Sequence, residues 1–540
     1  MIRERGVRAL LATVLFAVVT ILLAVGHRDV GYVRDEGIYF AASRDYARWV
    51  AEVVEAPARL GDRALRDRRF AINHEHPALM KIAAGVAART LAPRSGMREG
   101  AAMRLPAQLL AGLGAALLFL AASRRTGIAG GLLATGFVFT LPHVWFHAGL
   151  HAFDVPVMVA ILAVALAYLR ALKSAWGSLA LGVLLGVAIA IKHNALFMGP
   201  LLGLHLVCVV LRDPARTKRW RTLARIGSLP VVSMAVLAPL VAFALWPWLW
   251  NAPFPRLREY FAFHAQHNWY NMEFLGVNYN QPPMPFAYPW VMTWATVPTT
   301  LLVLAALGLV WRGRSGDAIA PRRVTGTFTS PLGTADPCER LLWTMLGLAP
   351  LLLIAWPTTP IFGGTKHWLT AYPFLALAAA QAWHGLWTLL ASPRRRVLEP
   401  LVLVLVLAPS TWSTVRGHPW NLSQYAPLVG GARGAADLGL NRGFWGHAVL
   451  PLLPHVRRED GPICLGDVHP LVQRQYAREG RWPEGIDTAV PPRCRSGLHF
   501  YELHMLTNEL ALWNRFGSAA PRELVALDDV PLASLYGTVD

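Results

Sequence analysis

Long apolar runs recur along the first 413 residues of this 540-residue chain. Each run has about 16 to 24 residues, close to the length that an α-helix needs to cross the hydrocarbon core of a bilayer. Only 15% of the residues are charged and the mean hydropathy is +0.38, which is not the profile of a soluble domain. The sequence therefore predicts a polytopic α-helical membrane protein.

Counting these runs predicts about eleven transmembrane helices. The expected helices cover residues 9–26, 101–122, 127–146, 155–169, 177–191, 195–211, 226–245, 289–311, 341–356, 369–390 and 397–412. The first follows a basic N-terminus and lacks a convincing cleavage site, so we expect a retained signal anchor. Residues 177–211, interrupted only by Lys192-His193-Asn194, would reverse the side of every later loop if they formed a single crossing.

Charge sets the expected orientation. The net charge is +19, and much of the Lys and Arg lies in short loops near residues 124, 170, 212–225, 312–340 and 394–396. Basic short loops face the cytoplasm, so we place the N-terminus there, in a bacterial-type plasma membrane, and accept two crossings in 177–211. The first outer loop, residues 27–100, and the tail then lie outside. Because these loops account for the charge, we expect no nucleic-acid partner.

This topology gathers polar side chains of both signs at the outer face. Cations there can neutralise a departing phosphate, and a carboxylate can accept the proton of an attacking hydroxyl. Carboxylates also stabilise the oxocarbenium-like centre of glycosyl transfer. The group comprises Asp35, Glu36, residues 73–76, Lys81, Arg104, Asp154, Lys192, His193, residues 264–279, Lys366 and His367.

Several short motifs in this set resemble the family 39 glycosyltransferases of the GT-C fold, which include protein O-mannosyltransferases and aminoarabinose transferases. The matching motifs are Asp35-Glu36, the HPALMK run at 76–81, Arg104-Leu105-Pro106, Asp154, the segment 274–289 and the tail motifs between 418 and 446. The resemblance implies a hexosyl- or pentosyltransferase that moves a sugar from a polyprenyl-phosphate donor to a hydroxyl acceptor on protein, lipid or glycan. It further implies single displacement with inversion, without metal or other cofactor.

The resemblance also implies roles for individual residues. Asp35 matches the catalytic base, with Glu36 beside it, and Asp154 matches a second acidic position near the reaction centre. Arg104 matches an arginine that supports the acidic pair. Glu75 and His76 stand where aminoarabinose transferases have an acidic residue and a phosphate-binding lysine, although a histidine is only partly charged at neutral pH. On the phosphate side we place Lys81, Lys192, His193, Lys366 and His367, while Lys192 and Lys366 have the alternative of snorkelling to the membrane interface.

The outer loop 264–279 is the expected acceptor loop. His264 and His267 form an H-x-x-H pair near Glu273, but polar loops often contain such pairs, so we expect no metal. Trp269 and Tyr279 either stack on a sugar or lie in the membrane interface.

Residues 414–540 differ from the helical domain, residues 1–413, in being rich in Gly, Pro and charge. Strand-like runs at 498–503, 524–527 and 532–536 predict a small outer α/β domain, which either binds the acceptor or covers the site. Cys464 and Cys494 are candidates for a disulfide there. Two other functions stay open: a lipid flippase or transporter, although no internal repeat is visible, and a non-catalytic scaffold.

Overall fold

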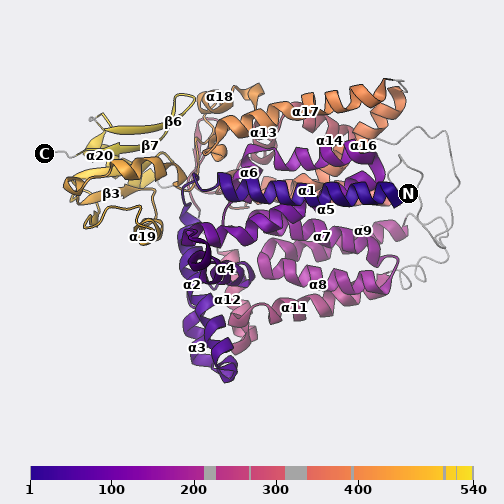
Figure 1. The fold of residues 1–540 in the computed structure, drawn as a ribbon, viewed down its shortest axis with the longest axis horizontal. Coiled ribbons are helices and arrows are strands. Elements are labelled where there is room, and N and C mark those ends of the chain that lie inside the picture. The colour runs from indigo at the N-terminus through magenta and orange to yellow at the C-terminus, as the bar shows by residue number, and fades with distance from the viewer. Residues whose placement is uncertain are drawn as a thin grey trace.

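The computed structural model describes residues 2–211, 227–266, 269–310, 337–390, 394–502, 506–517 and 520–537. Long helices run side by side in a bundle, with a small sheet region at one end and the N-terminus at the other (Figure 1). The expected basic loop 212–225, the stretch 312–336 and His267 lie outside the described residues.

Helices occupy the positions of all the predicted crossings. Seven of the described helices are long and apolar enough to cross a membrane, and two shorter apolar helices accompany them. The prediction of a multi-pass helical membrane protein is therefore confirmed. The helices at these positions are α1 (Ile2–Gly26), α5 (Glu99–Phe139), α7 (Asp154–Ala171), α8 (Ala175–Ile191), α9 (Met198–Leu211), η4 (Ser233–Leu237) with α11 (Ala238–Ala244), α13 (Tyr288–Thr296), α14 (Thr299–Val310), α15 (Pro337–Ala355), α16 (Tyr372–Leu390) and α17 (Arg395–Gly417).

Helix α5 is two helices joined by a tight turn. Gly127 has φ 76°, a left-handed conformation that glycine adopts without steric cost, and it interrupts the helical backbone. The two halves fold back on each other, which brings the Thr135 hydroxyl to 3.5 Å from the carbonyl oxygen of Ala115. The halves correspond to the two crossings predicted on either side of residues 123–126.

Residues 27–100 form helices rather than an extended polar loop. Helices α2 (Arg34–Glu55) and α4 (Leu79–Ser95) pack closely, because Gly85 faces the carbonyl oxygen of Ser43 and leaves no room there for a Cβ atom. Together with α3 (Arg63–Arg69) they lie across the end of the bundle (Figure 1). The short helices η5 (Pro247–Asn251) and α12 (Pro253–Ala265) join them.

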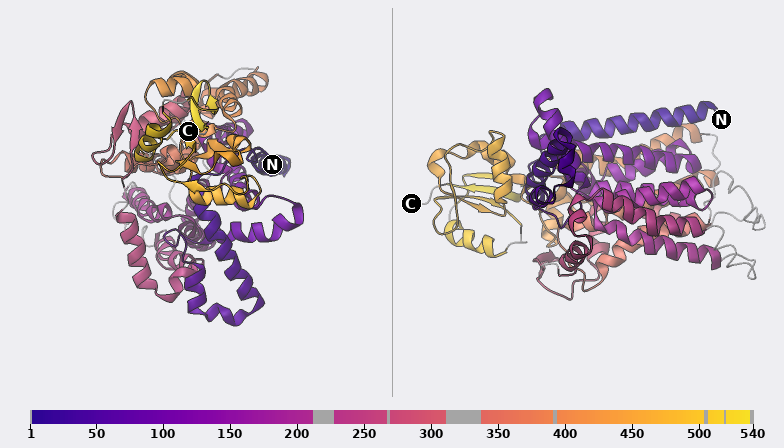
Figure 2. Two further views of the ribbon diagram at one scale, coloured as in Figure 1. Left: turned by 90° about the vertical axis from the view of Figure 1, so that its left-hand side faces the viewer. Right: turned by 90° about the horizontal axis from the view of Figure 1, so that it is seen from below.

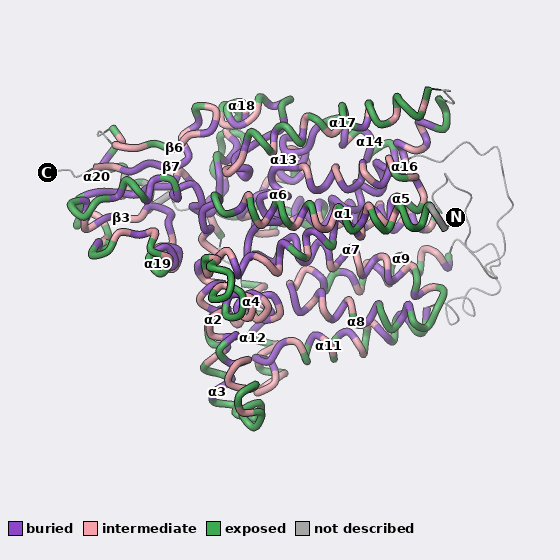
Figure 3. The backbone as a smooth tube through the Cα atoms, viewed as in Figure 1, coloured by how far each residue is buried: buried purple, intermediate pink, exposed green. Residues whose placement is uncertain are grey.

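Two tryptophans at the end of the predicted crossing 226–245, Trp246 and Trp248, pack inside the protein. Both are buried, at 3% and 5% exposure, in a core with Tyr46, Trp49 and Phe70 of the helices at this end. Large aromatic rings stabilise such a junction by the area they bury. The apolar side chains that do face outward lie on the bundle's outer helices, such as Leu10 on α1 and Val404 on α17, as Figure 3 shows for these helices.

The tail folds around a mixed five-stranded sheet, which confirms the predicted C-terminal sheet region. Its strands are β3 (Ile463–Gly466), β4 (Thr488–Ala489), β5 (Ser496–Phe500), β6 (Glu523–Leu527) and β7 (Val530–Tyr536), in the order β4-β3-β5-β7-β6. β3 pairs in parallel with β4 and β5, whereas β7 is antiparallel to β5 and β6. Helices α19 (Pro470–Arg478) and α20 (Leu506–Phe516) pack around it (Figure 2).

Candidate functional site

Two carboxylate–lysine pairs lie at the end of the bundle that carries the sheet region. Asp35 occupies the first turn of α2 and Asp154 the first turn of α7. Their partners are Lys366, in the short helix η6 (Gly364–Ala371), and Lys192, which caps the C-terminus of α8. Both carboxylates act electrostatically on the Lys366 ammonium and on the Tyr39 hydroxyl, so the two pairs share one site.

Glu36 and Arg104 form the rigid base of this site. Glu36 is fully buried, and its two oxygens accept hydrogen bonds from Arg104 Nε and Nη2 at 2.7 and 2.6 Å and from the backbone N–H of His151 at 2.8 Å. The remaining Arg104 N–H groups donate to the carbonyl oxygens of His27, Val30 and Gly31. All five guanidinium donors are thus used inside the protein. The pair fixes the loop before α2 and with it the position of Asp35.

Asp35 is the more accessible of the two acidic neighbours. Its side chain is 29% exposed and one oxygen lies 3.7 Å from Lys366 Nζ, beyond hydrogen-bond distance. Lys366 is 7% exposed, and its ammonium lies over the rings of Trp445 at 4.1 Å and Phe362 at 5.1 Å. Burial lowers the pKa of Lys366, while Asp35 and Asp154 act in the opposite direction. Asp35 is therefore free to take a proton beside a cation held by two aromatic faces.

The second pair is tighter. Lys192 Nζ donates a 2.6 Å hydrogen bond to Asp154, and both side chains are largely buried, at 14% and 6% exposure. Lys192 and Lys366 both point into the protein, so neither adopts the snorkelling alternative.

The side chain of Lys81 holds the turn at residues 73–76 through hydrogen bonds. The fully buried ammonium donates to the backbone oxygens of Asn73 and His76 and to the Asn73 side chain. Burial lowers the pKa of Lys81 to about 7. Since its three donors are occupied, we correct the expected role of Lys81 from phosphate contact to support of this turn. Glu75 accepts from Asn73 Nδ2 at 2.7 Å on the same turn.

His367 is likewise engaged within its own loop. One ring nitrogen contacts the backbone oxygen of Phe362, and burial lowers the pKa of His367 to about 3. A neutral ring with this contact does not supply the positive charge that the sequence led us to expect.

The acceptor loop approaches the Lys366 side of the site through Tyr270. Tyr270 packs against Phe362, with ring centroids 6.0 Å apart, and so lies next to the aromatic face that holds Lys366. Trp269 is 36% exposed, whereas Tyr279, the last residue of the short β1–β2 hairpin (Met272–Phe274 and Val277–Tyr279), packs partly buried against the bundle core.

Two further residues belong to the site and were missed in the sequence. The negative charges of Asp35, Asp154 and Glu75 act on the hydroxyl of Tyr39. Within the described part of the chain, no residue forms a hydrogen bond with this hydroxyl. It follows Asp35 by four positions on α2, so a helical reading of this segment would place both on one face. Trp445 stands in one of the tail motifs between 418 and 446, but its contact with Lys366 could not be predicted, because that contact joins distant parts of the chain.

The tail is docked directly onto the first turn of α2. Arg34 forms an ion pair with Glu502 at 2.9 Å, and the same carboxylate accepts from the backbone N–H of Trp445 at 2.8 Å. The rings of Tyr32 and Tyr476 stack with centroids 5.0 Å apart. The sheet region therefore helps to position Asp35. Within it, the sulfur atoms of Cys464 and Cys494 are bonded.

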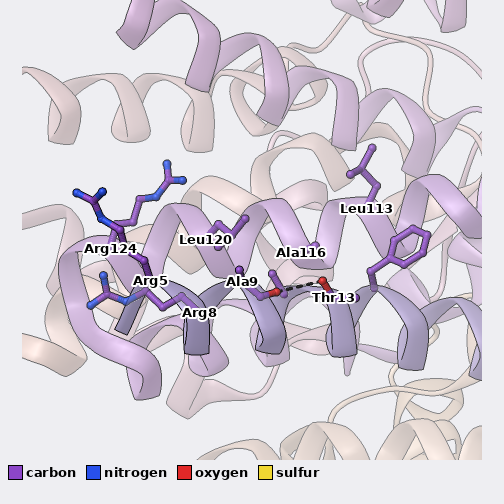
Figure 4. Close-up of a pocket in the computed structure, with 10 residues that line it drawn as sticks. Arg5, Arg8, Ala9, Thr13, Leu113, Ala116, Leu120 and Arg124 are labelled. Atoms are coloured by element: carbon purple, nitrogen blue, oxygen red, sulfur yellow. Dashed lines mark hydrogen bonds between the residues drawn. The ribbon is translucent and has the colours of Figure 1, made fainter. Parts of the chain in front are cut away.

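A separate cavity of about 860 Å³ lies at the opposite end of the bundle, between α1 and α5 (Figure 4). Its charged lining is the side chains of Arg5, Arg8 and Arg124, and the rest of its wall is apolar apart from Thr13. Guanidinium groups without a carboxylate among the lining residues suit the headgroup side of an anionic leaflet, not acid–base chemistry.

The fold and the site define a multi-pass helical membrane protein with a largely buried, charged site at the end that carries the sheet region. No model of a protein family and no curated protein matches the sequence.

Among solved structures, the chain is similar to ArnT from Cupriavidus metallidurans bound to undecaprenyl phosphate, at 14% identity over 97% of this chain and 98% of that chain, with a TM-score of 0.46. It is also similar to the apo state of that ArnT, at 15% identity over 97% of this chain and 97% of that chain, with a TM-score of 0.46. The apo oligosaccharyltransferase of Archaeoglobus fulgidus is 10% identical over 75% of this chain and 55% of that chain, with a TM-score of 0.47.

Proposed function

We propose that the chain is a GT-C-type glycosyltransferase that moves a sugar from a polyprenyl-phosphate donor to a hydroxyl acceptor. The observation that carries this proposal is the shared site of the Asp35–Lys366 and Asp154–Lys192 pairs. It supplies an accessible carboxylate and two ammonium groups at the edge of an apolar bundle, where a lipid-borne phosphate would arrive. The division into a helical domain, 1–413, and an outer domain, 414–540, belongs to the same proposal.

In this mechanism Asp35 takes the proton of the acceptor hydroxyl as its oxygen attacks the anomeric carbon. The bond from that carbon to the phosphate oxygen breaks, and the phosphate leaves with the bonding electrons. Lys366 and Lys192 stabilise the charge that develops on the leaving group. Attack opposite to the leaving group inverts the anomeric centre, and Asp154 orients Lys192 through their 2.6 Å hydrogen bond.

The proposed orientation places this site outside and the N-terminus in the cytoplasm of a bacterial-type plasma membrane. The arginine-lined cavity of Arg5, Arg8 and Arg124 supports it, because basic residues concentrate on the cytoplasmic side.

The direct test uses the purified full-length protein in lipid nanodiscs. Mass spectrometry of the co-purified lipids identifies the carrier, and radiolabelled polyprenyl-phosphate mannose and aminoarabinose are then offered with cell-envelope extract as acceptor. We expect label to move to the acceptor. Movement of the intact labelled lipid across a vesicle bilayer, without transfer, would instead establish a flippase. The absence of both activities would overturn the enzyme proposal.

We expect Lys192→Ala to weaken binding of polyprenyl phosphate by roughly 10- to 100-fold, because a hydrogen bond to a charged group contributes about 1.5–3 kcal/mol. Native mass spectrometry across a lipid titration measures the change. Lys173→Ala, which removes a lysine from the loop after α7, is the matched control and should bind as the wild type does. Equal affinity of the two variants would remove Lys192 from the phosphate site.

A further inference from the structure

Three histidines from distant parts of the sequence meet beside the Asp154–Lys192 pair. His76 lies in the turn before α4, His193 begins the short helix η2 (His193–Phe197), and His264 lies in the last turn of α12. One potential ligand atom from each lies within 4.8 Å of the other two. The ring centroids of His193 and His264 are 4.2 Å apart, and those of His76 and His264 are 5.8 Å apart.

Two of these rings have a nitrogen atom that the described part of the chain leaves without a partner. The Nδ1 atoms of His76 and His193 are buried and, within the described part of the chain, have no hydrogen-bond partner.

The ring of His264 is also oriented from outside the cluster. Its Nε2 atom lies 3.2 Å from the backbone oxygen of Glu75. Histidines that bind metal commonly donate their second ring N–H to a carbonyl or a carboxylate, which fixes the ring. This contact therefore has the geometry of an outer support for a ligand.

Packing alone explains the cluster less well. Phe153 and Phe263 contact His76, so the rings do have an aromatic wall. Phenylalanine at these three positions would pack against that wall equally well, however, whereas buried histidine nitrogens without hydrogen-bond partners cost free energy. A bound cation would satisfy them.

We propose that His76, His193 and His264 bind one divalent transition-metal ion, with Zn²⁺ as the preferred occupant. Three imidazoles and one open position are a common zinc arrangement. Nitrogen atoms bound tetrahedrally at about 2.0–2.1 Å from a metal lie roughly 3.3 Å apart, so the ligand atoms would have to approach by at most about 1.5 Å. Sequence spacing did not indicate this set, because the histidine pair weighed as a metal site there was His264 with His267.

The open position faces a site already rich in charge. His193 directly follows Lys192, which is paired with Asp154 at 2.6 Å. If the proposed transferase function holds, a phosphate oxygen of the donor is the natural fourth ligand. Metal binding itself does not depend on that function.

The test measures metal directly on the full-length protein. Samples are equilibrated with Zn²⁺, desalted and analysed by inductively coupled plasma mass spectrometry; Co²⁺ replaces Zn²⁺ in a second set for visible absorption. We expect close to one zinc per chain and the absorption bands of tetrahedral Co²⁺. His193→Ala and His264→Ala should each lower zinc occupancy at least tenfold.

His74→Ala is the matched control, since His74 stands two residues from His76 and contacts Glu259 and Trp248 instead of the cluster. It should keep the wild-type zinc content. Size-exclusion profiles verify that each variant is folded. If an alanine variant is not folded, the zinc content of His193→Gln is measured in its place. Wild-type protein without zinc, or equal zinc loss in His74→Ala, would overturn the proposal. Because no sugar transfer is measured, a missing transferase activity leaves this result unaffected.

Discussion

Asp35→Asn is expected to lower the rate of sugar transfer by roughly 10²- to 10⁴-fold, the usual contribution of a general base. Asparagine keeps the size of the side chain but cannot accept the hydroxyl proton. Polyprenyl-phosphate affinity should change little, because Asp35 contacts Lys366 only loosely, at 3.7 Å. Initial rates with labelled donor, together with lipid binding by native mass spectrometry, separate the two effects.

The control for this prediction is Asp45→Asn on the same helix. Asp45 lies in α2 and pairs with Arg48 and Arg69, away from the Lys366 pair. It should retain the wild-type rate. If Asp35→Asn keeps more than about a third of the activity, another group takes the proton and the assigned mechanism fails.

Glu36→Gln is expected to destabilise the protein by about 3–5 kcal/mol, because it leaves Arg104 charged and buried without its partner. We expect the substitution to affect mainly the free energy of unfolding and not the transfer step itself, since Glu36 is fully buried and its hydrogen bonds are to other groups of the protein. Thermal unfolding in detergent, followed by the loss of monodisperse protein, measures the change.

Glu459→Gln provides the comparison for this second prediction. Its pair with Arg457 is 3.7 Å long and two-thirds exposed on both sides, and exposed pairs contribute only about 0–1 kcal/mol. The double variant Glu36→Leu with Arg104→Leu should recover part of the loss, because no uncompensated charge is left. An unfolding midpoint for Glu36→Gln equal to that of Glu459→Gln would show that the pair is not a structural clamp.

Much of the fold was predictable because membrane helices obey a simple length and hydropathy rule. The turn at Gly127 and the strands β5, β6 and β7 also fell where local patterns indicated them. The helices of residues 27–100 were missed because their apolar residues are spaced for packing on one another, not for crossing a membrane. The burial of Trp246 and Trp248 could not be predicted from the sequence, because a ring suited to a membrane interface is equally suited to a buried junction.

For the site, the sequence indicated the residues but not their pairings. Asp35, Asp154, Lys192 and Lys366 do come together, whereas Lys81 is used to hold a turn. Which lysine is free depends on burial and on nearby backbone oxygens, which are tertiary properties. The histidine cluster is hidden for a related reason, since its members come from three segments that only the folded chain brings together.

The ion pair between Arg34 and Glu502 joins the start of the chain to a part that is synthesised much later. These residues are separated by 468 positions, and Trp445 reaches Lys366 from the same late part of the chain. A nascent chain, which folds from its N-terminus as it emerges, has its membrane helices in place well before these partners exist. Under the proposed function and orientation, the half-built protein therefore lies in the bilayer with an incomplete site, which is completed only when the final segment docks.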